Sequence, residues 1–357
     1  MGDLLQNPRL PHFREAPVSE LPYAHGGPPL TALLRATPED FVVDEDLGIT
    51  PSGEGEHVFL HVRKRGANSD WLAERIADFA GVSARDVSFA GMKDRHAVTT
   101  QTYSIHLPGK AAPDWTQFPE PGVEILSHAR HHRKLRRGAL NGNAFRITLR
   151  EAAGDRDRAD ACLQAIARDG VPNYFGEQRF GREGQNIQRA LAFFAGRRTP
   201  RKQHGMLISA ARSQIFNSVL ARRVEAASWN RILLGECCSL AGSRSWFVAD
   251  SEAQAALDAR AANGDIHPSG PLWGSGALPS QGEAAALEEA VARENQKLVE
   301  GLARQRLDQD RRALRLRPEG LQWEWIDTST LVLRFALPAG SYATAVLREL
   351  ADWHDAA

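Results

Sequence analysis

The sequence predicts an α+β fold in which a mixed sheet is interrupted by a second lobe. Segments rich in β-branched and aromatic residues dominate up to about residue 150, and helical periodicity replaces them from about 155 to about 305. Strand character then returns near the C-terminus, so the first and last segments are expected to pair in one sheet. The length of 357 residues allows two domains, and a cleft between them would be a common place for a site.

The first elements are predicted from residue type and spacing. Residues 39–47 (EDFVVDEDL) and 57–66 (HVFLHVRKRG) have the character of strands, with a Gly/Pro/Ser turn between them. Residues 68–82 (NSDWLAERIADFAGV) have the pattern of an amphipathic helix, with Ser69 or Asp70 as its N-cap and a glycine as its stop.

Two further strands are predicted from alternation. In residues 100–107 (TQTYSIHL) the apolar side chains are expected to face inward, while Thr102, Ser104 and His106 face outward, as in a half-buried strand. In residues 143–150 (NAFRITLR) Phe145 and the aliphatic residues alternate with two arginines and a threonine. The outward face of this strand is therefore expected to be cationic.

The middle of the chain is predicted to be helical, with glycines ending two of the helices. A Gly/Pro-rich stretch at residues 267–282 is expected to separate these helices from one long charged helix at 283–305. Paired strands and a capped terminal helix follow. The predicted ranges are 157–170, 186–196 and 205–228 for the first helices, 321–326 and 329–340 for the strands, and 341–352 for the last helix.

Charge is segregated although the formal net charge is zero, with 44 basic and 44 acidic residues. Residues 128–150 contain seven Lys or Arg and no acid, and further basic clusters occupy 196–204 and 311–318. Basic stripes of this kind can hold a phosphate backbone. The alternative for any single stripe is a solvated face without a partner.

Composition excludes several other classes. No apolar run approaches ~20 residues, so no membrane span is expected. The N-terminus lacks the layout of a signal peptide. Three cysteines without a CxxC pair suggest a reducing cytoplasm, and no disulfide framework. A zinc site would need His128, His131 and His132 to recruit distant thiolates, so no metal site is predicted.

The segment FAGMKDRHAVTTQ (89–101) carries the strongest chemical signal. Asp94 lies between Lys93 and Arg95, and neighbouring cations favour an ionised carboxylate. An anionic aspartate suits a nucleophile or a general base. The chain has no GxSxG elbow, Walker loop or GxGxxG fingerprint, so no cofactor is predicted. The alternative is a charged turn between two strands.

Three other stretches supply candidate residues for binding a base. Phe41 and Glu45 lie on one side of a predicted strand, Asn143 and Phe145 lie two residues apart, and Phe335 precedes a Pro/Gly turn. Each aromatic is core by default. Exposed aromatics near basic stripes can instead stack a flipped base. Asn143 has the alternative of a turn residue.

Five stretches together resemble the TruD family of tRNA pseudouridine synthases. They are TPEDFVVDE, FAGMKDRHAVTTQ, LNGNAFRITLR, VPNYFGEQRFG and FALPAGSYATAVLREL, in this order. The resemblance covers most of the chain. It implies a pseudouridine-synthase catalytic domain with a central mixed sheet at 1–168 and 310–357, and an inserted TruD-specific α/β lobe at 169–309.

The resemblance also implies an activity, the isomerisation of uridine 13 in the D-arm of tRNA. It carries the catalytic role to Asp94, a second active-site role to Lys93, and uracil contacts to Phe41, Asn143 and Phe335. The partner implied is tRNA, with no metal and no cofactor, and the protein is expected to be a cytoplasmic monomer. Residues with less defined supporting roles are Glu45, Phe145, Arg95 and Arg179.

Several alternatives stay open on the sequence. Asp94 can attack ribose C1′ or remove a ribose proton to give a glycal. Either Phe41 or Phe335 can be the stacking platform, and Lys93 with the 128–150 stripe is expected to hold nearby phosphates. A binding protein without chemistry is disfavoured because a carboxylate beside phosphates weakens binding. A small-molecule transferase or hydrolase would need a nucleotide loop or a second carboxylate.

Overall fold

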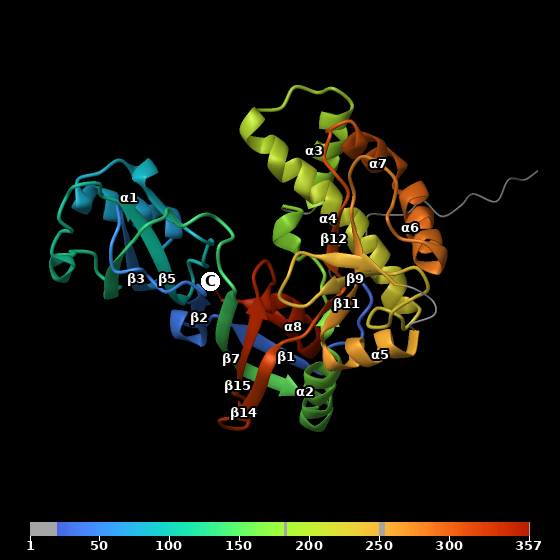
Figure 1. The fold of residues 1–357 in the computed structure, drawn as a ribbon. Helices are drawn as coiled ribbons and strands as arrows, with labels where there is room; N and C mark the ends of the chain where they lie inside the picture. The colour runs from blue at the N-terminus through green and yellow to red at the C-terminus, as the bar shows by residue number, and fades with distance from the viewer. Residues whose placement is uncertain (1–19, 182–183, 250–253, 357) are drawn as a thin grey trace, which may run out of the picture. The chain divides into compact units, whose positions relative to one another are not determined.

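The computed structural model describes residues 20–181, 184–249 and 254–356, and the chain divides into two compact units (Figure 1). The sheet unit holds His25–Val171 and residues 316–356. The helical unit holds residues 20–24 and Pro172–Arg315. The borders therefore fall after 171 and after 315, where the sequence placed them after 168 and after 309.

The sheet unit is built on one ten-stranded mixed sheet, as the sequence predicts. Along its main path the strands follow the order β14-β15-β7-β2-β5-β3-β6, and β1, β16 and β4 attach beside this path. The pairs β2–β5 and β1–β16 are parallel, and the other pairs are antiparallel. The strands are β1 (Leu30–Leu34), β2 (Phe41–Asp46), β3 (His57–Arg65), β4 (Val87–Phe89), β5 (Val98–His106), β6 (Val123–His131), β7 (Gly142–Gly154), β14 (Glu319–Trp325), β15 (Leu331–Pro338) and β16 (Ala351–Asp355).

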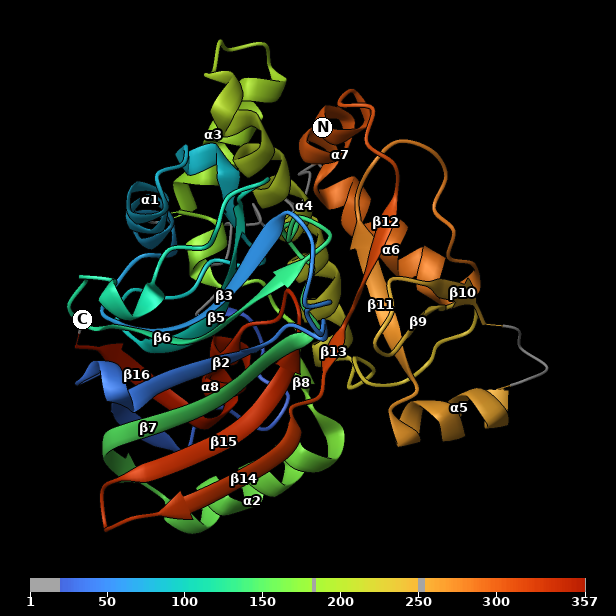
Figure 2. The ribbon, with the colours of Figure 1, turned by 60° about the vertical axis from the view of Figure 1, so that its left-hand side comes forward.

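Two helices cover one face of the β14–β15–β7–β2 part of this sheet (Figure 2). They are α2 (Arg156–Asp169) and α8 (Ala343–Leu350). Their apolar faces and the inward residues of the strands form one buried cluster, which includes Ile147, Leu163 and Val346. The last strands of the chain thus pair with the first ones, because burying this shared face removes apolar area from water.

A second core lies where α1 (Ser69–Ala80) packs on β3, β4 and β5. The helix ends at Gly81, whose left-handed φ of 63° supplies the predicted stop. The predicted N-cap is wrong by one or two residues, because Asn68 is the cap and Ser69 is the first helical residue. Ser69 is fully buried, and its hydroxyl is used elsewhere in the unit.

Most of the expected outward face of β5 is buried. Thr102 and Ser104 are 6% and 0% exposed, so the prediction of an outward face is wrong for these two residues, whereas the side chain of His106 is 37% exposed. The reason lies in the loop after β6, which places Leu135 against Phe59 and Ala90 and so covers the second face of the sheet. A loop can cover a sheet face in this way without any signal in the covered strand.

The helical unit packs around α4 (Arg201–Glu225), much of which is buried. A four-stranded sheet of order β10-β9-β11-β12 completes this unit. The predicted helix at 283–305 breaks at Asn295 into two helices, and the Gly/Pro-rich stretch contains strand β11, so both predictions are corrected. The other elements are α3 (Gln185–Phe194), α5 (Gln254–Asn263), α6 (Gly282–Glu294), α7 (Gln296–Ala303), β9 (Cys237–Leu240), β10 (Trp246–Val248), β11 (Ile266–Leu272) and β12 (Asp310–Ala313), with the short pair β8 (Val171–Pro172) and β13 (Arg315–Leu316) where the chain passes between the units.

Candidate active site

The MKDR segment lies in the loop that connects β4 to β5. The side chains of Ser69 and Gln101 form hydrogen bonds with the backbone of this loop. The Ser69 hydroxyl accepts a hydrogen bond from the amide of Lys93 (3.1 Å), and the Gln101 side chain donates to the Gly91 carbonyl (3.2 Å). Ser69 also donates to Gln101 (2.7 Å), which joins the two supports. The loop is therefore fixed by a buried network and is not a solvated turn.

Asp94 is fixed by two donors and stays partly open to solvent. Its Oδ2 accepts from Arg35 Nη2 (2.8 Å), and its Oδ1 accepts from the backbone amide of His96 (3.0 Å). The side chain of Asp94 is 30% exposed. The carboxylate is thus oriented and still reachable, which is the arrangement that a nucleophile or a general base requires.

Arg35 is the cation that pairs with Asp94, and the sequence analysis missed it. The residue follows β1, adopts a left-handed φ of 57°, and has a side chain only 8% exposed. Its Nη1 donates to Asp355 of β16 (2.5 Å), and its guanidinium lies 4.5 Å from the centre of the Phe41 ring. The sequence neighbours Lys93 and Arg95 were expected to favour the ionised form of Asp94, but within the described residues neither side chain forms a hydrogen bond or an ion pair with it.

Lys93 forms a buried ion pair with Glu45. The distance from its Nζ to Glu45 Oε2 is 2.8 Å, and the two side chains are 5% and 1% exposed. The other oxygen of Glu45 accepts from the amide of Thr102 (3.0 Å). The expectation that Lys93 holds nearby phosphates is therefore wrong for this structure, because its ammonium is covered and already paired. Glu45 therefore lies beside the candidate site, paired with the sequence neighbour of Asp94.

The three candidate aromatics pack on one another. Phe41, Phe145 and Phe335 are 5%, 9% and 4% exposed and belong to the main core of the sheet unit. The rings of Phe145 and Phe335 are stacked with centroids 5.5 Å apart, and Phe41 meets Phe145 edge-on at 6.2 Å. Phe145 is core, as its residue type suggests. Base stacking on Phe41 or Phe335 stays a prediction, and protein atoms cover both rings here.

Asn143 ends the row of inward side chains on β7. It lies opposite Glu45 on β2 and Leu337 on β15, so it belongs to a strand and the alternative of a turn residue is wrong. Its Oδ1 is buried and accepts no hydrogen bond from the described residues. An unsatisfied buried acceptor costs about 1–3 kcal/mol and calls for a partner such as a ligand or water. This oxygen can accept the N–H of a uracil.

A second buried lysine lies near the site. Lys64 of β3 is 0% exposed, and its ammonium donates to the carbonyl of Ala67 (2.5 Å). Burial, with a further contribution from the charge of Lys93, lowers the pKa of Lys64 to about 8, and the charge of Asp94 opposes this shift. The alternation of β3 places Lys64 on the buried face, but its residue type gave no reason to expect burial.

The other supporting candidates differ in position. Arg95 is exposed on the MKDR loop. Arg179 lies in the helical unit, where its guanidinium donates to Ser209 (2.8 Å) and lies 5.2 Å from the ring centre of Phe175. The loop around it is braced by Asn217, whose side chain bonds both the amide and the carbonyl of Phe175. Arg179 is therefore held within its own unit, and a contact with RNA stays a prediction.

The three basic stripes differ in how far their cations are exposed. In 128–150, the segment Arg133–Arg137 exposes four cations and is tied to the MKDR loop by a bond from the Gly138 amide to the Ala90 carbonyl (2.8 Å). In 311–318, Arg311 is buried against Glu288, so the expectation of a phosphate-binding stripe there is wrong. The cations of 196–204 are exposed at the turn between α3 and α4.

A search of the described residues finds no group of three or more His, Cys, Asp or Glu that could hold a metal ion. None of the helices in the described ranges has the length and apolarity that a membrane span requires.

Comparisons with known proteins agree on one family. The family model described as tRNA pseudouridine synthase D (TruD) matches residues 18–193 and 183–350. A protein named tRNA pseudouridine synthase D from Xanthomonas euvesicatoria is 50% identical over 355 residues, which cover 95% of this chain and 96% of the relative. One of the same name from Methylococcus capsulatus is 48% identical over 336 residues, with 94% and 95% covered.

A solved structure has the same fold. It is a crystal structure from Methanosarcina mazei assigned to tRNA pseudouridine synthase D (TruD), with a TM-score of 0.72 and 24% sequence identity. The match covers 92% of this chain and 95% of the other. At this identity the likeness concerns the fold alone.

Proposed function

Since this chain belongs to the TruD family of tRNA pseudouridine synthases, we propose that it converts uridine 13 in the D-arm of tRNA to pseudouridine, with Asp94 as the catalytic group. The family membership makes the chain an isomerase that modifies tRNA, so tRNA is its substrate. The position of the uridine and the roles of individual residues are the finer part of the proposal.

The observation that carries the role of Asp94 is its fixed and partly open carboxylate. Arg35 and the amide of His96 orient the two oxygens, and 30% of the side chain remains exposed. An oriented anion positioned before substrate arrives reduces the entropy and reorganisation that the reaction must supply.

The reaction requires a group of this kind. The bond from ribose C1′ to uracil N1 breaks, the base turns, and C1′ joins uracil C5. The proton on C5 is then lost and N1 gains one, so the product is an isomer of the substrate. Asp94 either attacks C1′ or removes a ribose proton to form a glycal, and both routes use the carboxylate as an anion. No hydride, phosphoryl or electron transfer occurs, which is the basis for proposing that no cofactor or metal takes part.

Asn143 is proposed to recognise the uracil. Its buried Oδ1 lacks a donor among the described residues, and the N3–H of uracil is a donor of the right kind. Asn143 lies opposite Glu45, which binds Lys93, the neighbour of Asp94. The amide and the carboxylate therefore belong to one connected region of the sheet unit. Removing the base from its stack costs a few kcal/mol, which stacking on Phe41 or Phe335 can offset once the ring is uncovered.

The two units are proposed to match two domains. The sheet unit holds Asp94, Asn143 and the three phenylalanines, so we assign it to the pseudouridine-synthase catalytic domain. The helical unit is then the inserted TruD-specific domain. We further propose that the protein acts as a monomer in the cytoplasm, and that Arg95 and the exposed cations of Arg133–Arg137 contact phosphates near the target nucleotide.

The position of the target is tested with two unmodified tRNA transcripts labelled with tritium at uridine C5. One has uridine 13, and the other has cytidine 13 with an otherwise identical sequence. We expect tritium release from the first transcript to exceed that from the second by one equivalent per tRNA. Equal release from both would contradict uridine 13 as the target, and release from neither would contradict the activity itself.

A further inference from the structure

The turn between α3 and α4 carries an unusual concentration of positive charge. Residues 184–224 contain eight Lys or Arg and no Asp or Glu. Exposed helices ordinarily carry acids that pair with such cations, so this stretch needs partners from elsewhere. Other segments of the helical unit supply acidic partners for two of these cations: Arg222 pairs with Glu294 (2.7 Å), and Arg223 pairs with Glu236 (2.7 Å).

Four of the cations remain without such partners. Arg197, Arg198, Arg201 and Lys202, which we call the α3–α4 tip, are all exposed. Within the described parts of the chain, none of their side chains forms a hydrogen bond, an ion pair or a contact with an aromatic ring. Four uncompensated charges within six residues repel one another, and a polyanion would remove this repulsion.

Two residues of the tip lie at the N-terminus of a helix, where positive charge is unfavourable. Arg201 and Lys202 are the first residues of α4, a helix of 25 residues whose first turn contains no acid. Cations at a helix N-terminus oppose the helix dipole, where Asp or Glu would be favourable. The sequence therefore places charge where it reduces stability, and a binding function explains why it does so.

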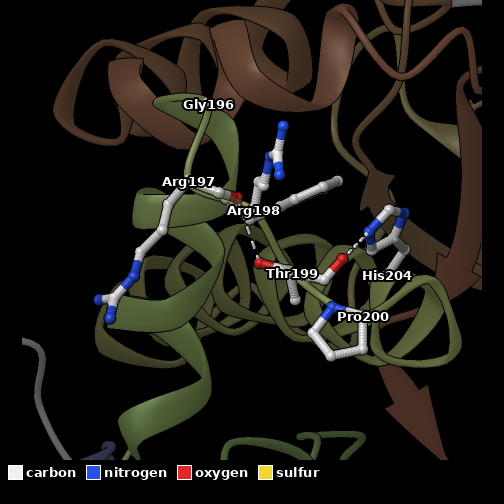
Figure 3. A pocket seen from close by; sticks show the side chains of 7 residues that line it. Gly196, Arg197, Arg198, Thr199, Pro200 and His204 are labelled. Atoms are coloured by element: carbon white, nitrogen blue, oxygen red, sulfur yellow. Dashed lines mark hydrogen bonds between the residues drawn. The ribbon is translucent and has the colours of Figure 1, made fainter.

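A pocket of about 520 Å³ opens beside the tip, lined by Phe193, Thr199, Pro200 and His204 with the two arginines (Figure 3). The His204 ring is held by a hydrogen bond with the Thr199 carbonyl (2.9 Å) and lies 4.5 Å from the ring of Phe193. Aromatic rings flanked by cations are suited to a nucleotide of an RNA strand, because the base stacks while the phosphates meet the charges.

We propose that the α3–α4 tip is a second tRNA-binding site that holds the phosphate backbone through Arg197, Arg198, Arg201 and Lys202, next to a pocket that accepts one unpaired nucleotide. The inference rests on the proposed function only in taking tRNA as the polyanion. The site contributes affinity and takes no part in the chemistry, because the proposed reaction uses the Asp94 carboxylate and requires no cation of the tip.

The test is the double variant Arg201→Glu/Lys202→Glu, with Arg293→Glu/Lys297→Glu as the matched control. Both variants reverse two exposed charges on helices of the same unit. The Kd for tRNA is measured by filter binding over a range of salt, and the Tm and the kcat and KM of tritium release are measured alongside. For the tip variant we expect Kd and KM to rise roughly tenfold or more, and the salt dependence of log K to become shallower by about 2.

The remaining readouts separate binding from folding and from chemistry. The Tm of the tip variant should equal or exceed that of the wild type, because acids suit the first turn of α4. Its kcat should be unchanged, and the control should bind nearly as the wild type does. A tip variant that binds tRNA like the control would overturn the inference, as would a loss of binding to anionic lipid vesicles with unchanged tRNA affinity. A wild type that binds tRNA but releases no tritium would contradict the proposed function, and the Kd values would still decide about the tip.

Discussion

Arg35 shows how a single residue can organise the candidate site. One side chain binds Asp94 and Asp355, which lie 59 and 320 positions away in the sequence, and it also covers the ring of Phe41. Its backbone is left-handed, a conformation that costs a non-glycine residue of the order of 1–3 kcal/mol. The surrounding structure holds Arg35 in this strained conformation, as expected for a residue whose role is to orient Asp94.

We expect Arg35→Lys to lower kcat by roughly a hundredfold while KM stays near its wild-type value. The ammonium keeps the charge but cannot bind both carboxylates with the planar geometry of a guanidinium. The control is Asp355→Asn, which weakens only the far anchor of Arg35 and should lower kcat much less. A wild-type kcat in Arg35→Lys, measured by single-turnover tritium release, would rule out this positioning role.

Lys64 should make the stability of the protein depend on pH in the alkaline range. Its pKa is lowered to about 8 in the folded state, whereas an unfolded lysine titrates near ~10.4. Between these values the unfolded chain binds a proton that the folded chain does not, so the free energy of unfolding rises with pH. Below pH ~8 the full cost of burying the charged ammonium is present.

The variant Lys64→Met removes this cost and the titration with it. At pH 7 we expect its free energy of unfolding to exceed that of the wild type by about 1–3 kcal/mol, less the lost bond to Ala67. The difference should shrink as the pH rises from 8 to 10.4. Urea unfolding at several pH values measures it, with the exposed Lys297→Met as a control. Parallel curves for the wild type and Lys64→Met would contradict the lowered pKa.

At the residue scale, the sequence allowed some of the site to be predicted and not the rest. Lys93 and Asp94 are adjacent in a short motif, so their association needs no knowledge of the fold. Their partners Glu45 and Arg35 come from strand β2 and from the residue that follows strand β1, and only the folded sheet brings them near. From the sequence, the charge of Asp94 was expected to be balanced by its neighbours along the chain, whereas the cation that binds it in the structure is Arg35.

At the scale of elements, local patterns predicted some of the strands and missed others. The pairing of β14 with β15 and the end of α1 are as expected. Strand β11 was missed because it contains Pro268, Gly270 and Pro271, which usually indicate turns. It forms a strand because tertiary packing buries these residues between β9 and β12. Strands β1 and β16 were also missed, since their parallel pairing depends on contacts about 320 residues apart.

Gly142 is a test of how the start of β7 is formed. A methyl group at this position would lie 2.3 Å from the carbonyl oxygen of Leu337, so Gly142→Ala must displace β15 beside Asn143. We expect a loss of about 1–3 kcal/mol in the free energy of unfolding and a higher KM. Gly205 in α4 has open space around it, and Gly205→Ala should stabilise the helix by about 0.5–1 kcal/mol. Chemical denaturation of the two variants should therefore give shifts of opposite sign, and equal shifts would refute this explanation.

At the scale of the whole molecule, a net charge of zero does not show which cations are exposed and which are buried. Acids and bases balance over the chain, but the Arg133–Arg137 segment and the α3–α4 tip each expose four cations close together in the sequence. Overall composition could not predict this distribution, because Arg311 and Arg315 of the third basic stripe are buried. Only the folded chain separates cations that can meet RNA from cations that stabilise the interior.

The proposal of a monomer without a metal or cofactor applies to the whole molecule as well. Protein treated with EDTA and passed through a desalting column should retain its full rate of tritium release. Light scattering during size-exclusion chromatography should give a mass near 39.2 kDa. A rate that falls after EDTA and recovers on adding a divalent ion to the enzyme would contradict metal independence, and a doubled mass would contradict the monomer.

The central claim is that the Asp94 carboxylate performs chemistry and does not merely shape a loop. The most direct test is the single-turnover rate of tritium release by Asp94→Asn at saturating tRNA, with the Kd for the same tRNA measured by filter binding. Asparagine keeps the size, and its single oxygen can accept a hydrogen bond from either Arg35 or His96, but it is neither an anion nor a base. We predict that release is abolished while Kd stays within about threefold of the wild-type value. Release at the wild-type rate would contradict the account, and Asp94 would then be only part of a charged turn.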